Sequence, residues 1–446
     1  VQRIIVKKLT PIIIWIIAPL MAQGQTLLEN YTSSDTSGLG ADFHGFIRGI
    51  IYTGMTPEPR KMEAKSLYGE AALQMQASFR SWGKGVAELR FRKGSAFGSD
   101  MDMLQLREGF VEIYAGRFEF AFGQQIIVWG KADGINPTNQ ITPQDALIRS
   151  PDPDDSRMGN ILFRTRYQMA NAASLEALWI PHYEPSILPW QFAALPEGTM
   201  FSEGPYPDTK LENSALAVKF AWQLPSFDGS LSYNNGYGLN PGITADVPGP
   251  LEPPPAVTEI YTKAYRQQII GMDFSTTIGA TGLRGEAAYR ITKKDQRDRL
   301  EVPNPDLYYV VGLDRFFGPV HIIAQYIGRY VFDFAELIPP TDSLDMMRYA
   351  LENGNRLFHM QQVEWSHSTS LRVAMDLMHE TMTAEVFGMG NFSTDEYVVI
   401  PKFSYRISDG LRFSLGLEYY SGVQNTLYDI IEDHFNSVFM EFKAMF

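Results

Sequence analysis

Hydrophobic and polar residues alternate strictly in many short segments of the chain. In Leu411–Tyr419 the odd positions are apolar, whereas Arg412, Ser414 and Glu418 stand between them. The same period of two recurs at 87–92, 117–123, 161–167 and 283–290. Because successive side chains of a β-strand point to opposite faces, the pattern predicts strands with one apolar and one charged face.

The spacing of these strands predicts how they are joined. The strands run to about 9–11 residues, the length of a tilted strand that spans a membrane. Tight turns, among them one at Ser366–Thr369, alternate with long segments such as 93–103, 124–159, 181–211 and 236–264. A soluble sandwich would also alternate, but strand length and turn spacing favour a membrane barrel. We therefore expect an all-β fold, a transmembrane antiparallel β-barrel of about 18 strands, with 16 as the alternative, long extracellular loops and short periplasmic turns.

The N-terminal residues predict a secretory signal peptide. Three cations precede a short apolar stretch at 12–22, and Ala22 and Gly24 stand at the −3 and −1 positions of a cleavage site. This stretch is little more than half of the roughly 20 apolar residues that a transmembrane helix needs. The expected regions are a signal peptide over 1–24, a periplasmic segment over 25–42 and a barrel over 43–446.

The last residues form an amphipathic strand, 438–446, that ends on Phe446. Such a strand resembles the signal that bacterial outer-membrane proteins present to the barrel assembly machinery. We expect it to pair with the first strand, at about 43–52, because closure removes edges that a bilayer cannot tolerate. An even number of strands places both termini in the periplasm. The expected location is the outer membrane of a Gram-negative bacterium.

Composition excludes several classes of function. The 446 residues include 38 Lys and Arg against 51 Asp and Glu, a formal net charge of −13, which argues against a nucleic-acid partner. Cysteine is absent, so a disulfide scaffold and a Cys-based zinc site are excluded. No Walker or dinucleotide motif occurs, and the neighbours His367 and Ser368 would point to opposite faces of a strand. We expect no enzyme, cofactor or bound metal, although clustered Asp152, Asp154 and Asp155 leave cation binding open.

If the apolar face meets lipid, the charged face lines a lumen in which cations outnumber anions. Such a wall would favour anionic or polar solutes. The alternative is ion pairing across the whole wall, which would fill the interior. The cations proposed to line the pore are Arg90, Arg92, Arg117, Arg164, Arg166, Arg284 and Arg412.

The most distinctive segment, at 116–145, reads GRFEFAFGQQIIVWGKADGINPTNQITPQD. It resembles a motif in a family of Gram-negative outer-membrane porin-like proteins of uncharacterised function, distantly akin to alginate-export barrels. The resemblance implies a porin-like barrel and leaves the solute undefined. The motif positions are Gly116, Gln124, Gln125, Trp129, Gly130, Asn136 and Pro137.

The same segment begins the long loop 124–159. Its start, Ile126–Trp129, is too apolar for a free surface loop, so we expect the loop to fold into the lumen and narrow it. The alternative is an outer lid packed on neighbouring loops. The expected constriction residues are Lys131, Asp133, Asp145 and Arg149.

These features predict an outer-membrane porin for the passive passage of small polar or anionic solutes, narrowed by loop 124–159. Its expected partners are outer-membrane lipid, the assembly machinery and the solutes. The alternatives are an export channel for a polymer or an apolar molecule, a plugged structural or adhesion barrel, and a barrel hydrolase.

Overall fold

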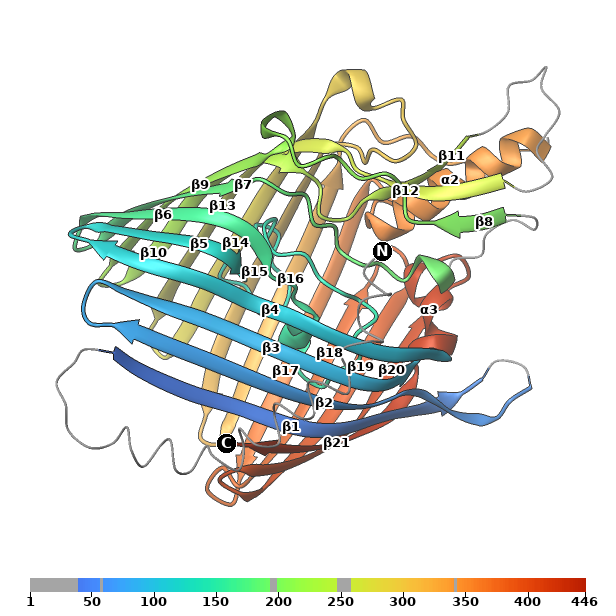
Figure 1. The fold of residues 1–446 in the computed structure, drawn as a ribbon. Helices are drawn as coiled ribbons and strands as arrows, with labels where there is room; N and C mark the ends of the chain where they lie inside the picture. The colour runs from blue at the N-terminus through green and yellow to red at the C-terminus, as the bar shows by residue number, and fades with distance from the viewer. Residues whose placement is uncertain (1–38, 57–58, 193–198, 247–257, 341–342) are drawn as a thin grey trace.

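The fold is a closed β-barrel of 18 antiparallel strands (Figure 1). It is seen in a computed structural model that describes residues 39–56, 59–192, 199–246, 258–340 and 343–446. The preferred strand number is therefore confirmed over the alternative of 16. The predicted signal peptide and most of segment 25–42 lie outside the described residues.

The elements follow one another in a simple order. Each barrel strand pairs with the next one along the chain, and β21 pairs with β1. The barrel strands are β1 (Leu39–Met55), β2 (Met62–Phe79), β3 (Gly83–Ala96), β4 (Ser99–Ala115), β5 (Phe118–Gln125), β6 (Asn160–Ala170), β7 (Ala173–Ile180), β9 (Ala215–Leu224), β10 (Phe227–Tyr237), β13 (Arg266–Ile278), β14 (Thr281–Thr292), β15 (Asp306–Phe317), β16 (Val320–Val331), β17 (Trp365–Leu377), β18 (Met382–Asn391), β19 (Glu396–Ser408), β20 (Leu411–Gly422) and β21 (Ser437–Met445).

The first and last strands close the barrel as predicted. Their register runs from Phe46 opposite Met445 to Thr53 opposite Val438. Beyond this ladder, the backbones of Gly45 and Phe446 exchange two N–H···O bonds of 3.0 Å. Strand β1 begins at Leu39, earlier than the predicted start of the barrel. Closure leaves no unpaired strand edge, which is the condition for crossing a bilayer.

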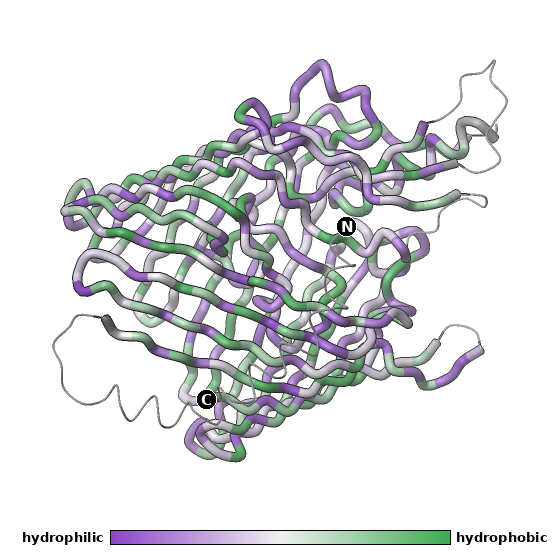
Figure 2. Tube along the Cα trace, in the orientation of Figure 1, coloured by the Kyte–Doolittle hydropathy of each residue, from purple (hydrophilic) through white to green (hydrophobic). Residues whose placement is uncertain are grey.

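The two faces of the strands divide as the alternation predicts. On β20, Leu415 is 39% exposed on the outer face, whereas Ser414 is 3% exposed on the inner face. Figure 2 shows hydrophobic and hydrophilic residues alternating along the strands around the barrel. The exposed apolar side chains form the belt that would face lipid.

Strand connections differ between the two ends of the barrel. Turns of two to four residues join the strands at one end, and the other end carries the long connections 126–159, 181–214, 238–265 and 332–364. A long loop expected near 93–103 is instead a tight turn at 97–98, where Phe97 and Gly98 adopt positive φ angles of 50° and 75°. The barrel therefore has fewer long loops than predicted.

A turn expected at Ser366–Thr369 is also wrong. Strand β17 runs through these residues, and the turn follows it at 378–381. Ser368 and Ser370 are buried on the inner face, so small polar residues line the lumen here. Because serine is common in turns, this strand has the composition of a turn.

Further elements cover the end that carries the long loops. A three-stranded sheet of β8 (Thr199–Ser202), β11 (Gly242–Ala245) and β12 (Thr258–Lys263) lies there with α2 (Ser343–Phe358). They share an apolar core that includes Ile243, Ile260 and Leu351. A second helix, α3 (Leu427–Phe435), packs against β20. Neither helix in the described part of the chain is long and apolar enough to cross a membrane.

The lipid-facing role of the outer face can be tested with two arginine substitutions on neighbouring strands. A charge on the lipid side of the bilayer midplane costs about 2–4 kcal/mol. Leu415→Arg should therefore lower the free energy of unfolding in liposomes much more than Ser404→Arg, since Ser404 lies on the inner face of β19 beside Ser414. Equal losses would mean that the faces are assigned wrongly.

Candidate functional site

Loop 126–159 lies inside the barrel and bonds to inward-facing side chains on opposite sides of it. Its Asp155 pairs with Arg48 on β1 and Arg90 on β3. Its backbone is held by Glu286 on β14, which is nearly half the strand order away from β3. The expected inward fold of this loop is therefore found, and the outer-lid alternative is not.

The carboxylate of Glu286 is the anchor on the β14 side. It accepts four hydrogen bonds from the loop: from the N–H groups of Lys131 (3.0 Å), Ala132 (3.2 Å) and Thr138 (2.7 Å), and from the Thr138 hydroxyl (2.7 Å). Glu286 is almost fully buried. A buried carboxylate needs such donors, so it holds the segment 131–138 in one conformation.

Two glycines allow the loop and the wall to approach this closely. Gly130 has a φ of +114°, and an added Cβ would lie 2.5 Å from a Glu286 oxygen. On the wall, a Cβ added to Gly271 of β13 would lie 2.8 Å from the Thr138 methyl carbon. At Gly130 a side chain would displace the loop from Glu286, and at Gly271 it would collide with the Thr138 methyl group unless residue 138 changed as well, which explains the glycine at these positions.

The apolar start of the loop packs on the wall formed by β6, β7 and β9. Ile127 and Trp129 belong to a core with Leu162, Leu178 and Ala217. The Trp129 indole donates to Glu176 of β7 at 2.8 Å, and the Lys219 ammonium lies 5.1 Å from the centre of the indole ring. The indole thus places its apolar body in the core and its N–H on a wall carboxylate.

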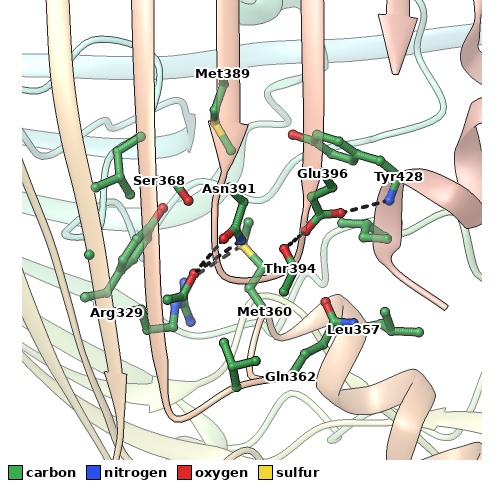
Figure 3. Close-up of a pocket in the computed structure, with 16 residues that line it drawn as sticks. Arg329, Leu357, Met360, Gln362, Ser368, Met389, Asn391, Thr394, Glu396 and Tyr428 are labelled. Atoms are coloured by element: carbon green, nitrogen blue, oxygen red, sulfur yellow. Dashed lines mark hydrogen bonds between the residues drawn. The ribbon is translucent and has the colours of Figure 1, made fainter. Parts of the chain in front are cut away.

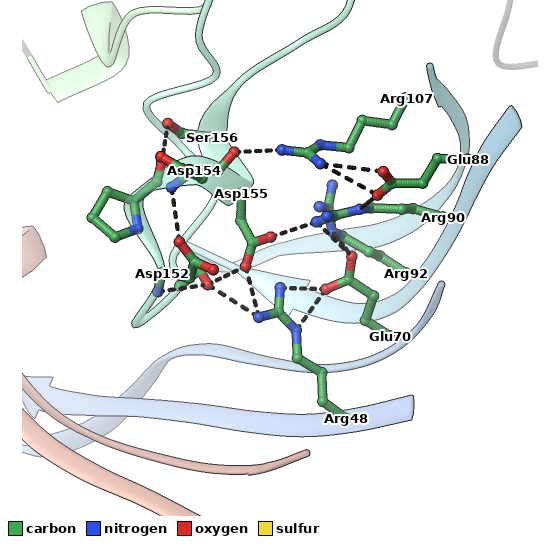
Figure 4. A network of polar contacts seen from close by, with 12 residues as sticks. Arg48, Glu70, Glu88, Arg90, Arg92, Arg107, Asp152, Asp154, Asp155 and Ser156 are labelled. Atoms are coloured by element: carbon green, nitrogen blue, oxygen red, sulfur yellow. Dashed lines mark hydrogen bonds and ion pairs between the residues drawn. The ribbon is translucent and has the colours of Figure 1, made fainter. Parts of the chain in front are cut away.

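A network of charged side chains holds the other end of the loop (Figure 4). Four guanidinium groups and four carboxylates alternate in it, with bonds such as Arg48 Nε to Glu70 (2.7 Å) and Arg90 Nη1 to Asp155 (2.6 Å). Equal numbers of the two charges compensate each other in the buried interior. The members are Arg48, Arg90, Arg92, Arg107, Glu70, Glu88, Asp155 and Glu441.

Asp155 is the residue through which the loop joins this network. Burial would raise its pKa, but Arg48 and Arg90 outweigh burial and hold the pKa well below its usual range. Asp152 and Asp154 do not converge on it, since Asp152 caps the 3-10 helix η3 (Pro153–Ser156) by accepting from the Asp154 N–H. No group of acidic or histidine residues suited to a metal occurs among the described residues.

The expected constriction residues have different positions. Arg149 is buried and donates to Glu418 of β20 at 2.6 Å, so it anchors the loop. Asp145 is buried and accepts from the Leu147 N–H within the loop, and burial raises its pKa. Asp133 is half-buried and pairs with Arg372 of β17 at 3.3 Å. Lys131 is half-buried and forms no ion pair within the described part of the chain.

Most cations proposed to line the pore are paired. Arg90 and Arg92 belong to the network above, and Arg164 pairs with Glu112. Arg284 and Arg166 have weaker contacts, to Asp314 at 3.3 Å and Glu119 at 3.9 Å. Arg412 faces inward without an ion pair to another described residue. The interior is therefore much closer to charge balance than a count of cations on the wall predicts.

Arg117 was assigned wrongly to the wall. It lies in the turn between β4 and β5, with Gly116 at a φ of +63°, and donates to the Met169 carbonyl at 3.1 Å. A turn residue at the barrel end cannot line the pore in the way an inward-facing strand residue does.

The remaining motif residues lie at the end of β5 and in the segment 131–138 that Glu286 holds. The side-chain amides of Gln124 and Gln125 donate to the carbonyls of Leu106 and Leu162. The Pro137 carbonyl accepts from Gln140, and the Asn136 amide, oriented to satisfy both its atoms, donates to the Ala132 carbonyl at 2.8 Å. The motif therefore covers the entry of the loop into the barrel and the segment that binds Glu286.

A family model described as "Protein of unknown function (DUF1302)" matches residues 102–423, more than half of the chain. The chain belongs to this family. The match includes the whole of loop 126–159. No similar protein was found among curated proteins.

Among solved structures, this DUF1302 protein shares its fold with outer-membrane porins. OccAB3 of Acinetobacter baumannii matches with a TM-score of 0.53 and 9% identity, covering 91% of this chain and 99% of that one. OccK5 (OpdH) of Pseudomonas aeruginosa matches with a TM-score of 0.52 and 9% identity, covering 91% and 97%. At such low identity the likeness concerns the fold alone, and the expected kinship with alginate-export barrels stays a prediction.

The anchoring role of Asp155 predicts a pH-dependent stability. Because its pKa is lowered in the folded protein, its stabilisation is present above its unfolded pKa of about 3.9 and is lost as the pH falls below that value. Asp155→Asn should remove this acid-labile part and lower the unfolding free energy by roughly 3–5 kcal/mol at neutral pH.

The matched control is Asp154→Asn, since Asp154 is exposed and, among the described residues, its carboxylate forms an ion pair with Arg157 alone. Unfolding of the purified barrel measured between pH 1.5 and 7 distinguishes the two variants. If both variants follow the wild-type curve, Asp155 does not anchor the loop.

Proposed function

We propose that this protein is an outer-membrane channel for the passive passage of small polar or anionic solutes, narrowed by loop 126–159. The contacts of that loop with opposite walls are the observation that carries the proposal. A loop fixed across a barrel reduces the open cross-section without blocking it, provided that part of the wall stays free.

The free part of the wall is expected at β18 and β19. Loop 126–159 forms no hydrogen bond or ion pair with these strands among the described residues. Their inner face carries Glu385 and Lys402, a pair at 3.4 Å that keeps about a fifth to a quarter of each side chain exposed. We expect the water path to run between this pair and the Asp133–Arg372 pair.

The charges on this path would set selectivity only weakly. Both pairs are neutral overall, so neither repels ions of one sign strongly. Lys131 and Arg412 lack ionic partners in the described residues and supply the cationic excess that would favour anions. The plugged adhesion barrel is the competing proposal, since the mouth carries α2, α3 and a small sheet that could close it.

The experiment is single-channel recording in planar bilayers. Deleting Gly130–Gln144 removes the segment that Glu286 holds, and should raise conductance severalfold while the strands of the barrel remain. A deletion variant that inserts normally with unchanged conductance would contradict narrowing by the loop. A wild-type protein that inserts without conducting would favour the plugged barrel.

Selectivity is read in the same recordings from reversal potentials. Lys131→Glu should shift permeability toward cations, most strongly at low salt where screening is weakest. Lys131→Gln is the matched control and should give about half of that shift.

A further inference from the structure

A cleft at the loop end of the barrel adjoins the proposed path (Figure 3). It lies between the inner face of β15–β19 and the helices α2 and α3, and encloses about 590 Å³, counting the part open to solvent. Much of its lining is apolar, with Ile327, Leu357, Met389 and Leu427. A wall of this composition is unusual for a path that would carry only polar solutes.

One side of the cleft carries a charge that is not balanced. Arg329 and Arg290 both pair with Asp306, at 2.8 and 3.2 Å, and neither has another ion pair within the described residues. All three side chains are largely buried, with at most 14% of any one exposed. Two guanidinium groups on one carboxylate leave a net charge of +1, in contrast to the balanced network around Asp155.

The neighbouring His359 does not change the net charge of this group. Burial, together with Arg290 and Arg329, lowers the pKa of His359 to about 3, so its ring is neutral at physiological pH. Its backbone carbonyl accepts from Arg329 Nη1 at 3.0 Å. Within the described residues, the hydrogen bond found for the other terminal nitrogen, Nη2, is to the sulfur of Met360 at 3.9 Å, a weak acceptor. The guanidinium group also lies over the Tyr308 ring, 4.0 Å from its centre. Arg329 thus keeps a donor available at the cleft.

Glu396, the carboxylate that lines the cleft, already accepts hydrogen bonds from neighbouring groups. It accepts from the Thr394 hydroxyl at 2.6 Å and from the Tyr428 N–H at 3.1 Å, in the first turn of α3. The positive end of the helix dipole stabilises it there. Figure 3 shows Glu396 and Arg329 on opposite sides of the cleft. Glu396 therefore does not neutralise the guanidinium groups.

From this arrangement we infer that the cleft binds a small amphipathic carboxylate, with the carboxylate on Arg329 and the apolar body on Leu357 and Met389. The inference rests on the proposed channel and names a class of solute for it. A carboxylate would balance the charge of the Arg290–Arg329–Asp306 group and accept a hydrogen bond from Nη2 of Arg329. The flexible thioethers of Met360 and Met389 can adapt to bodies of different shape.

Binding to the purified barrel is measured by calorimetry with three probes. These are 3-phenylpropionate, its neutral analogue 3-phenylpropan-1-ol, and propionate, which lacks the aromatic body. We expect 3-phenylpropionate to bind at least tenfold more tightly than either of the others. Equal binding of the alcohol, or of propionate, would overturn the inference, as would no binding of 3-phenylpropionate.

Variants assign the two parts of the cleft. Arg329→Gln leaves Asp306 paired with Arg290. It should abolish the preference for 3-phenylpropionate over 3-phenylpropan-1-ol without weakening the binding of the alcohol. Met389→Gln should weaken the binding of both 3-phenylpropionate and 3-phenylpropan-1-ol. Ser404→Gln, on the inner face outside the cleft, is the control and should change neither. If Arg329→Gln keeps the preference for the acid, the carboxylate does not bind there.

Conductance separates this inference from the proposed function. A barrel that conducts but binds no 3-phenylpropionate contradicts the cleft and leaves the channel standing. A barrel that binds 3-phenylpropionate but does not conduct contradicts the channel alone. In a conducting barrel, 3-phenylpropionate should also reduce the current at concentrations that fill the cleft.

Discussion

Charged side chains that are buried inside a barrel are stable only when each finds a partner, because an unpaired buried ion costs several kcal/mol. This constraint fixes the interior of the protein. The walls supply both signs, and Arg48 and Arg90, which also pair with wall carboxylates, share Asp155 from the loop. Wall and loop therefore depend on each other, and the loop cannot leave the lumen without uncovering charges.

The same constraint gives the interior its two regions. Where loop 126–159 binds, carboxylates such as Glu286 and Glu418 accept hydrogen bonds from donors of the loop. At β18 and β19 the loop forms no polar bond within the described residues, and the pair Glu385–Lys402 stays partly exposed. A path for solutes is expected only in the second region. The apolar cleft with its unbalanced Arg290–Arg329–Asp306 group stands at the loop end of that region.

The sequence predicts the barrel well because the period of two is set by the backbone. Alternation identified the inward-facing residues on strands such as β20, and the terminal strand identified closure onto β1. It failed at β17, where serines line the lumen and give a strand the composition of a turn. It also expected a long loop where the tight turn at 97–98 joins β3 and β4.

The site was predicted less completely. The entry of the loop into the barrel could be inferred from the apolar Ile126–Trp129, since such residues need cover. The residues that anchor the loop could not be inferred, because Glu286 and Glu418 lie far along the chain from the loop they hold. The local signal of them is an inward-facing carboxylate on each of the strands β14 and β20. Arg149 was taken for a pore residue because its partner was not visible in the sequence.

The central claim, that loop 126–159 is fixed inside the lumen, is tested most directly by a reversible covalent lock. Thr138→Cys with Gly271→Cys places two thiols in a chain without other cysteines, at positions whose β-carbons would lie 3.3 Å apart. Disulfides join β-carbons about 3.5–4.5 Å apart, so a shift of a few tenths of an ångström suffices. We expect oxidation to link the pair in the folded barrel while single-channel conductance stays the same before and after reduction. Two thiols that remain free, or a conductance that falls when they are linked, would contradict the account.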